Sequence, residues 1–179
     1  MSALSAFLST WTATRATFGD GAPVDGAQLD GRAVRDGQEL ARSAAPRGDW
    51  SGDGSAAYGA VNEAQVSALG TFADIDRRFG AEIGRSAEVV GTGRRDLDAV
   101  RKWVVDAAAT VPNNAAGQHL LWSIVGKGVG EVQNIVSRSA AEQSEIAGRV
   151  RALGDEYEML GTDGTGGAMN DDPHYGRPR

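Results

Sequence analysis

The chain has 179 residues, enough for one domain with its own hydrophobic core. It contains no cysteine, which excludes disulfides, thiolate metal sites and cysteine nucleophiles. Its net charge of −6 disfavours nucleic acid as a partner, because a protein that follows phosphates needs a local positive excess. The short basic pairs Arg77/Arg78 and Arg94/Arg95 adjoin acidic residues, which indicates a solvated face of mixed charge.

Residues 2–18 predict a short amphipathic helix, which the Gly- and Pro-containing segment 19–23 ends. Docking of this helix against the rest of the chain is the favoured interpretation. Binding at a membrane surface is the alternative, but the polar face has a single arginine. No basic residue precedes the apolar run, so we expect no signal peptide, and no stretch is long enough to span a bilayer. The apolar face comprises Leu4, Phe7, Leu8, Trp11 and Phe18.

A second helix is predicted over residues 27–45, because Pro46 and Gly48 end the pattern there. Residues 47–55 are rich in Gly, Asp and Ser and read as a turn, with Asp53 or Ser55 available to cap the next helix. The residues expected to point inward from the second helix are Leu29, Ala33, Val34, Leu40, Ala41 and Ala44.

A long helix is predicted over residues 54–109, where no proline occurs and apolar residues recur at steps of three and four. Gly91 and Gly93 make a kink or break there an expectation. After a turn at 111–114, a second long helix is predicted over residues 115–160, and the short connector implies an antiparallel pair. The apolar stripe of the first comprises Tyr58, Val61, Leu69, Phe72, Ile75, Phe79, Ile83, Ala87, Val90, Leu97, Val100 and Val104.

The sequence therefore predicts an all-α, elongated antiparallel helical bundle with two long helices and shorter N-terminal helices. The expected domain spans residues 1–160, and residues 161–179 are expected to be a disordered tail, since they hold almost nothing apolar.

We find no constellation of residues that carries catalysis. The two histidines, His119 and His174, are too far apart in the predicted fold to share a metal ion. The paired aspartates at 74/76 and 96/98 diverge on a helix, which disfavours shared acid–base chemistry. We therefore expect a protein that is not an enzyme, with no catalytic residues, no cofactor and no metal.

One motif carries information: Trp50-Ser51-Gly52 between two helical segments, followed by Ala56, Ala57 and Tyr58. Glycine permits a tight turn, the indole offers a large apolar plane at the hairpin end, and alanines allow close helix approach. The alternative reading is an ordinary helix–helix turn with a buried tryptophan.

This arrangement resembles the W-x-G proteins of mycobacterial type VII (ESX) secretion, and more closely the EspA/EspE group. The Gly-Asp turn before Trp50, the Ala-Asp-Ile-Asp-Arg segment 73–77 and the Arg-Arg-Asp-Leu-Asp segment 94–98 support the resemblance, which covers residues 28–108. It implies a non-enzymatic substrate or co-substrate that acts through helix–helix contacts and is secreted or surface-exposed after a cytoplasmic pool. Trp50, Gly52, Ala56, Ala57 and Tyr58 would form the secretion signal.

The resemblance also implies partners: a helical protein carrying a Y-x-x-x-[D/E] motif, and the secretion machinery or its chaperone. The present chain lacks a strict form of that motif, since Tyr58, Tyr157 and Tyr175 have Asn62, Gly161 and Arg179 at the fourth place. A partner is therefore expected to supply it. A cytosolic homodimeric scaffold without an export role is the alternative function. The residues expected to contact a partner helix are Leu69, Phe72, Ile75, Phe79 and Ile83.

Overall fold

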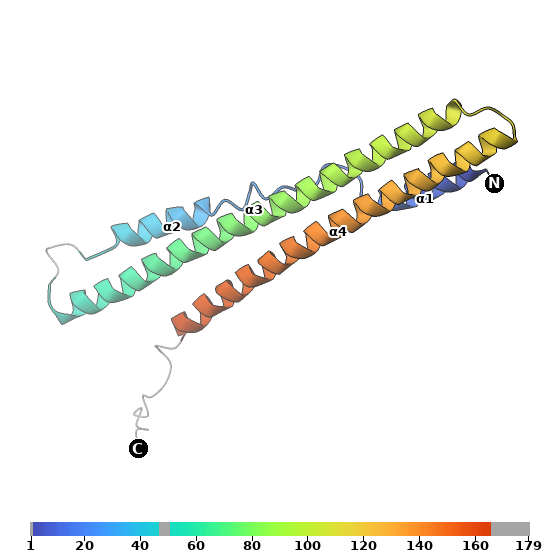
Figure 1. Cartoon of the computed structure of the whole chain (residues 1–179). Coiled ribbons are helices and arrows are strands. Elements are labelled where there is room, and N and C mark those ends of the chain that lie inside the picture. The colour runs from blue at the N-terminus through green and yellow to red at the C-terminus, as the bar shows by residue number, and fades with distance from the viewer. Residues whose placement is uncertain (1, 47–50, 166–179) are drawn as a thin grey trace, which may run out of the picture. The chain divides into compact units, whose positions relative to one another are not determined.

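The computed structural model describes residues 2–46 and 51–165, apart from the side chains of residues 162–165. Four helices follow one another along the chain (Figure 1): α1 (Ala3–Thr17), α2 (Arg32–Ser43), α3 (Asp53–Ala109) and α4 (Ala115–Thr165). Within these described ranges there is no strand. The prediction of an all-α fold with two long helices and shorter N-terminal helices is confirmed.

Two helix boundaries and one internal feature differ from the prediction. The second helix begins at Arg32, because Gly31 preceding it has a φ of +66° and a side chain there would approach the Ala73 carbonyl oxygen to 2.3 Å. The fourth helix continues to Thr165, five residues past its expected end, and the rest of the expected tail, 166–179, lies outside the described residues. Of the kink or break expected at Gly91–Gly93, a break is wrong, since α3 is one continuous helix.

The chain divides into two compact units. Unit 1 comprises residues 1–28 and 80–149, and unit 2 comprises residues 29–79 and 150–179. Each unit therefore contains part of α3, part of α4 and one of the shorter helices.

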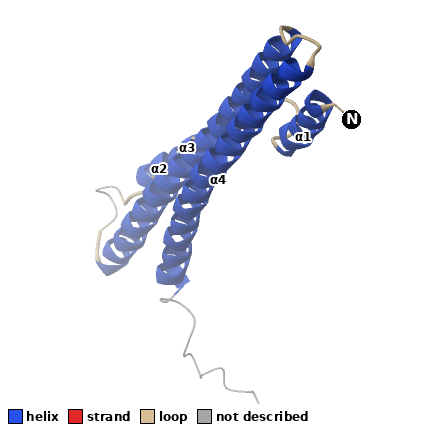
Figure 2. Ribbon diagram, turned by 45° about the vertical axis from the view of Figure 1, so that its right-hand side comes forward, coloured by secondary structure: helices blue, strands red, loops and turns tan. Residues whose placement is uncertain are grey.

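In unit 1, α3 and α4 run antiparallel, as predicted (Figure 2). The Ser86 hydroxyl donates to Gln143, and Asp96 pairs with Arg138. Residue numbers along α4 therefore fall as those along α3 rise, as they do in an antiparallel pair. The buried core consists largely of the apolar stripe residues of the two helices, together with two residues of α1. Its members are Ala3, Phe7, Leu97, Val104, Val125, Val132 and Ile135.

Helix α1 packs on the other helices of unit 1. This favours docking against the rest of the chain over binding at a membrane surface. Phe7 is 2% exposed and occupies the space left by Gly128, where a side chain would come within 3.1 Å of its ring. The indole N–H of Trp11 donates to the Leu97 carbonyl at 2.7 Å, and the Arg101 guanidinium lies 5.1 Å from the indole centroid.

The end of α1 is held by Arg94. Its Nε donates to the Phe18 carbonyl at 3.0 Å, and the guanidinium also donates to the Gly21 carbonyl. Gly93 lies beside this contact, and a side chain on it would meet the Phe18 ring at 2.3 Å. The interpretation of Arg94 as part of a solvated face is therefore wrong, because the residue satisfies carbonyl groups where α1 ends.

In unit 2, α2 attaches to α3 through polar contacts. The Asn62 amide donates to the Ala41 carbonyl and the Gln38 amide to the Val66 carbonyl, each at 2.8 Å. The helix itself has no buried residue. The inward set predicted for it is therefore wrong: Leu29, Ala33, Leu40 and Ala44 are exposed, and only Val34 and Ala41 are half-buried.

Replacing Phe7 by Ala is expected to destabilise the docked state of α1 by about 3 kcal/mol, because it removes a buried aromatic ring and leaves a cavity in its place. Amide hydrogen exchange of residues 3–17 measures this loss. The matched control is Thr12→Ala, an exposed position on the same helix. Equal protection in both variants would show that α1 does not depend on this contact.

Candidate interaction site at the start of α3

An apolar stripe runs along one face of α3 in unit 2. Its first members are Tyr58, Val61, Leu69 and Phe72, whose spacings keep them on that face of a helix. Its later part is covered by the chain's own α4. The Phe72 and Tyr157 rings lie 4.9 Å apart, and Ile75 is 2% exposed. In its first part α4 does not cover Val61, which is 58% exposed, and Tyr58 is 41% exposed.

The exposure follows from the relative reach of the two helices. Tyr157 lies against Phe72, and α4 continues for eight residues to Thr165, which is about 12 Å at 1.5 Å per residue. In an antiparallel pair this brings the described end of α4 level with about residue 64 of α3. Val61 and Tyr58 lie beyond that point, and Figure 1 shows α3 extending past the end of α4.

An ion pair fixes the C-terminal part of α4 in register. The Arg78 guanidinium donates to both Glu156 carboxylate oxygens, at 2.6 and 2.7 Å. The hydrogen bond from Arg78 lowers the pKa of Glu156 below its usual value, although partial desolvation opposes the shift, and the same contact raises the pKa of Arg78. Sequence patterns did not single out this pair.

The predicted signal residues flank this exposed stripe. Gly52 has a φ of +103° and accepts a hydrogen bond from the Ala56 amide at 3.1 Å, so it forms the start of α3. Ala56 and Ala57 are exposed on the first turns. Trp50, the central residue of the sequence motif, lies outside the described residues.

The five residues predicted to contact a partner are not equally placed. Ile75 is buried and the Phe72 ring packs on Tyr157, so both are already used inside the chain. Leu69, Phe79 and Ile83 are half-buried. Val61 belongs to the predicted stripe but not to the five predicted contact residues, and it is more exposed than any of them.

Three of the four aspartates in the acidic pairs noted in the sequence have ion-pair partners. Asp74 pairs with Arg77, Asp96 with Arg138, and Asp98 lies 3.5 Å from Arg15. Across the described part of the chain no group of three or more His, Cys, Asp or Glu residues is placed to hold a metal ion. The helices described here also include none that is long and apolar enough to cross a membrane.

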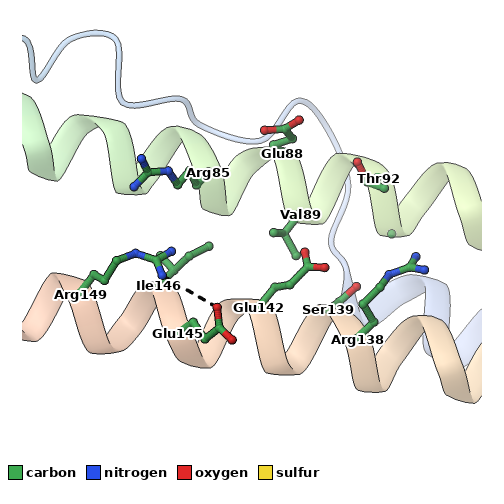
Figure 3. Close-up of a pocket in the computed structure, with 11 residues that line it drawn as sticks. Arg85, Glu88, Val89, Thr92, Arg138, Ser139, Glu142, Glu145, Ile146 and Arg149 are labelled. Atoms are coloured by element: carbon green, nitrogen blue, oxygen red, sulfur yellow. Dashed lines mark ion pairs between the residues drawn. The ribbon is translucent and has the colours of Figure 1, made fainter.

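A hollow lies in unit 1, between α3 and α4. It has a volume of about 300 Å³ and is lined mainly by arginine and glutamate side chains (Figure 3). Arg149 pairs there with Glu82 at 2.9 Å, and Glu82 is buried and also pairs with Arg85. These ion pairs neutralise the buried carboxylate of Glu82 and link α3 to α4. The arrangement is that of a structural ion-pair network.

Within the described residues of unit 2, the site combines an exposed apolar side chain on α3 with an ion pair between α3 and α4. The model of the EspA/EspE family matches residues 18–99. Over these residues, which make up less than half of the chain, the sequence is similar to the EspA/EspE family. No curated protein and no solved structure matches the chain.

Glu156→Gln is expected to reduce thermal stability at pH 7, and this reduction is expected to shrink as the pH is lowered into the acid range. A carboxylate whose pKa is lowered in the folded state stabilises it above the unfolded pKa, and the contribution disappears as pH falls through the folded pKa. Melting temperatures of both proteins over a descending pH series measure the difference. The control is Glu158→Gln, an exposed neighbour on the same helix. A difference between the two proteins that does not shrink with falling pH would contradict the assignment.

Proposed function

We propose that the protein is a non-enzymatic substrate or co-substrate of a type VII secretion system, and that it acts by binding a helical partner. The observation that carries the proposal is the exposed Val61 on the first turns of α3, in a chain whose residues 18–99 match the EspA/EspE family. An apolar stripe that extends beyond the end of the helix packed on it is a suitable binding site for another helix.

The partner's position follows from the packing of unit 2. A helix laid along residues 57–61 would continue the line of α4 and bury the same face of α3 that Tyr157 covers further along. The alanines at 56 and 57 allow such a helix to approach closely. In this proposal the partner carries the Y-x-x-x-[D/E] motif that the chain lacks, and the two together present Trp50 and Gly52 to the secretion machinery.

The proposal includes a location and a route. The protein is held in the cytoplasm with its partner and then leaves as a folded helical complex for the cell surface or medium. Deletion of the export ATPase gene is expected to remove the protein from the culture filtrate, and an unchanged amount there would contradict the proposal.

Trp50→Ala is expected to abolish export while leaving the melting temperature of the protein unchanged, because the indole serves recognition by another macromolecule. Immunoblots of culture filtrate and cell lysate measure export, and circular dichroism measures stability. The control is Trp122→Ala, since Trp122 is 65% exposed in unit 1. A loss of stability without a specific loss of export would instead indicate an ordinary structural tryptophan.

Val61→Asp is expected to lower affinity for the partner at least about tenfold, because the partner helix would have to desolvate a charge within an apolar contact. Co-purification of the tagged chain with proteins from the same cells, followed by titration with the recovered partner, measures the effect. Val24→Asp is the matched control, since Val24 is 84% exposed in unit 1. Equal losses for both variants would place the partner elsewhere.

A further inference from the structure

Three large apolar side chains are exposed near the turn that joins α3 to α4 in unit 1 (Figure 1). Trp103 is 41%, Leu120 50% and Trp122 65% exposed. Trp103 lies six residues before the end of α3 at Ala109, and Leu120 and Trp122 lie five and seven residues after the start of α4 at Ala115. At 1.5 Å per residue, all three are therefore within about 11 Å of the end of the helical pair. Residues 103–122 form the tip of unit 1.

The exposed side chains lie on both sides of the tip. Trp103 follows Arg94, which holds the end of α1, by nine residues, and 100° per residue places it on the opposite side of α3. Leu120 lies on the same side of α4 as Lys127, whose ammonium is 5.8 Å from the centroid of the Trp103 ring. Trp122 lies about 160° around α4 from Leu120. Trp103 and Leu120 therefore occupy one side of the tip, and Trp122 occupies the other.

The tip carries little charge. Residues 107–130 contain no Asp or Glu, and Lys127 is the only Lys or Arg among them, although the whole chain has a net charge of −6. The nearest acidic residue on α3 is Asp106, whose carboxylate lies 2.6 Å from the Lys102 ammonium. Moving the tip out of water therefore costs less than moving a surface that carries unpaired charges.

The backbone of the turn forms its own hydrogen bonds. The Val111 amide donates to the Ala108 carbonyl at 3.2 Å, and the Asn114 amide donates to the Pro112 carbonyl at 2.9 Å. The Asn114 side-chain oxygen accepts from the Gly117 amide at 2.8 Å. Backbone groups that are already paired lose little when water is withdrawn from them, so the turn itself is compatible with an apolar surrounding.

The placement of the three side chains indicates what covers them. A helix of another protein packed on one side of the tip would cover Trp103 and Leu120 but leave Trp122 in water. A lipid surface surrounds the end of the helical pair and covers both sides at once. Tryptophan is enriched at the level of lipid headgroups, because its ring is apolar and its N–H is polar. Apolar groups of surface-bound helices reach about 5–10 Å into this layer, which matches the distance of the three side chains from the end of the pair.

We propose that the tip of unit 1 inserts into the interfacial layer of a lipid bilayer, with Trp103, Leu120 and Trp122 at the level of the headgroups. Burial of the apolar side chains drives the insertion, and the Lys127 ammonium reaches the headgroup phosphates while its stem stays in the apolar layer. Because the chain is acidic outside the tip, headgroups without net charge are preferred over anionic ones. The contact is separate from the export signal proposed above and from the partner site at Val61.

Flotation of the full chain with phosphatidylcholine vesicles tests the insertion. Trp103→Ser and Trp122→Ser are each expected to lower the partition coefficient about fivefold, because each removes a large ring from the headgroup layer. The two losses are expected to multiply in the double variant, since the side chains lie on opposite sides of the tip. Leu120→Ser is expected to weaken binding as well. Its matched control is Leu40→Ser in unit 2, where Leu40 is 73% exposed, and this control is expected to bind as the unmodified chain does.

A charge placed in the tip gives a second test. Gln118→Glu is expected to lower the partition coefficient about tenfold, because the new carboxylate would have to leave water. Gln65→Glu makes the same change at an exposed position of unit 2 and is expected to have no effect. Vesicles that contain phosphatidylserine are expected to bind the unmodified chain more weakly at about 10 mM salt, where charges act over about 30 Å, and this difference is expected to shrink at about 150 mM salt. Circular dichroism checks that each variant keeps its helix content.

Three results would overturn the proposal. The first is a chain that stays unbound at about 5 mM phosphatidylcholine, well above the lipid concentration at which a single myristoyl chain binds. The second is a loss of binding in only one of the two tryptophan variants, which would indicate a one-sided contact such as that with a helix of another protein. The third is stronger binding to anionic than to uncharged vesicles, which would place the contact at basic residues outside the tip.

Discussion

The packing of α3 against α4 along two apolar stripes is the interaction on which the rest of the structure depends. In unit 1 it buries Leu97 and Val104 with Val125 and Val132, and it creates the groove that receives α1. In unit 2 it brings Phe72 onto Tyr157 and sets the register that leaves the first turns of α3 uncovered. Each exposed surface considered above is a part of one of these helices that its neighbour does not reach.

Small residues decide how closely the shorter helices approach. At Gly93 a side chain would collide with the Phe18 ring, and at Gly128 it would collide with Val104 and crowd the Phe7 ring. Glycine within a helix costs about 1 kcal/mol relative to alanine, and at both positions it leaves room for an aromatic ring. Gly93, one of the two glycines that suggested a break in α3, therefore permits an aromatic side chain to lie against an unbroken helix.

The surface of α3 near Val61 and the hollow between α3 and α4 in unit 1 differ in their chemistry. The stripe at Val61 is apolar, and the exposed residues Ala56 and Ala57 lie beside it. The hollow in unit 1 is charged, and Glu82 pairs there with both Arg149 and Arg85. The apolar stripe therefore offers a contact surface, whereas the charged side chains of the hollow are largely paired with one another.

Periodicity and composition were sufficient to predict the helical class, the antiparallel long pair and most of the core, because steps of three and four place apolar residues on one face wherever the helix lies. The family was also accessible from residues 50–58 and 73–77, since motifs are local. The ends of helices, the polar attachment of α2 through Asn62 and Gln38, and the role of Arg94 were not accessible. Each depends on which residue of a distant segment lies opposite, and register is fixed by packing between segments that are far apart in the chain. For the same reason the pattern could identify Val61 as apolar, while its exposure followed from where α4 stops beside it.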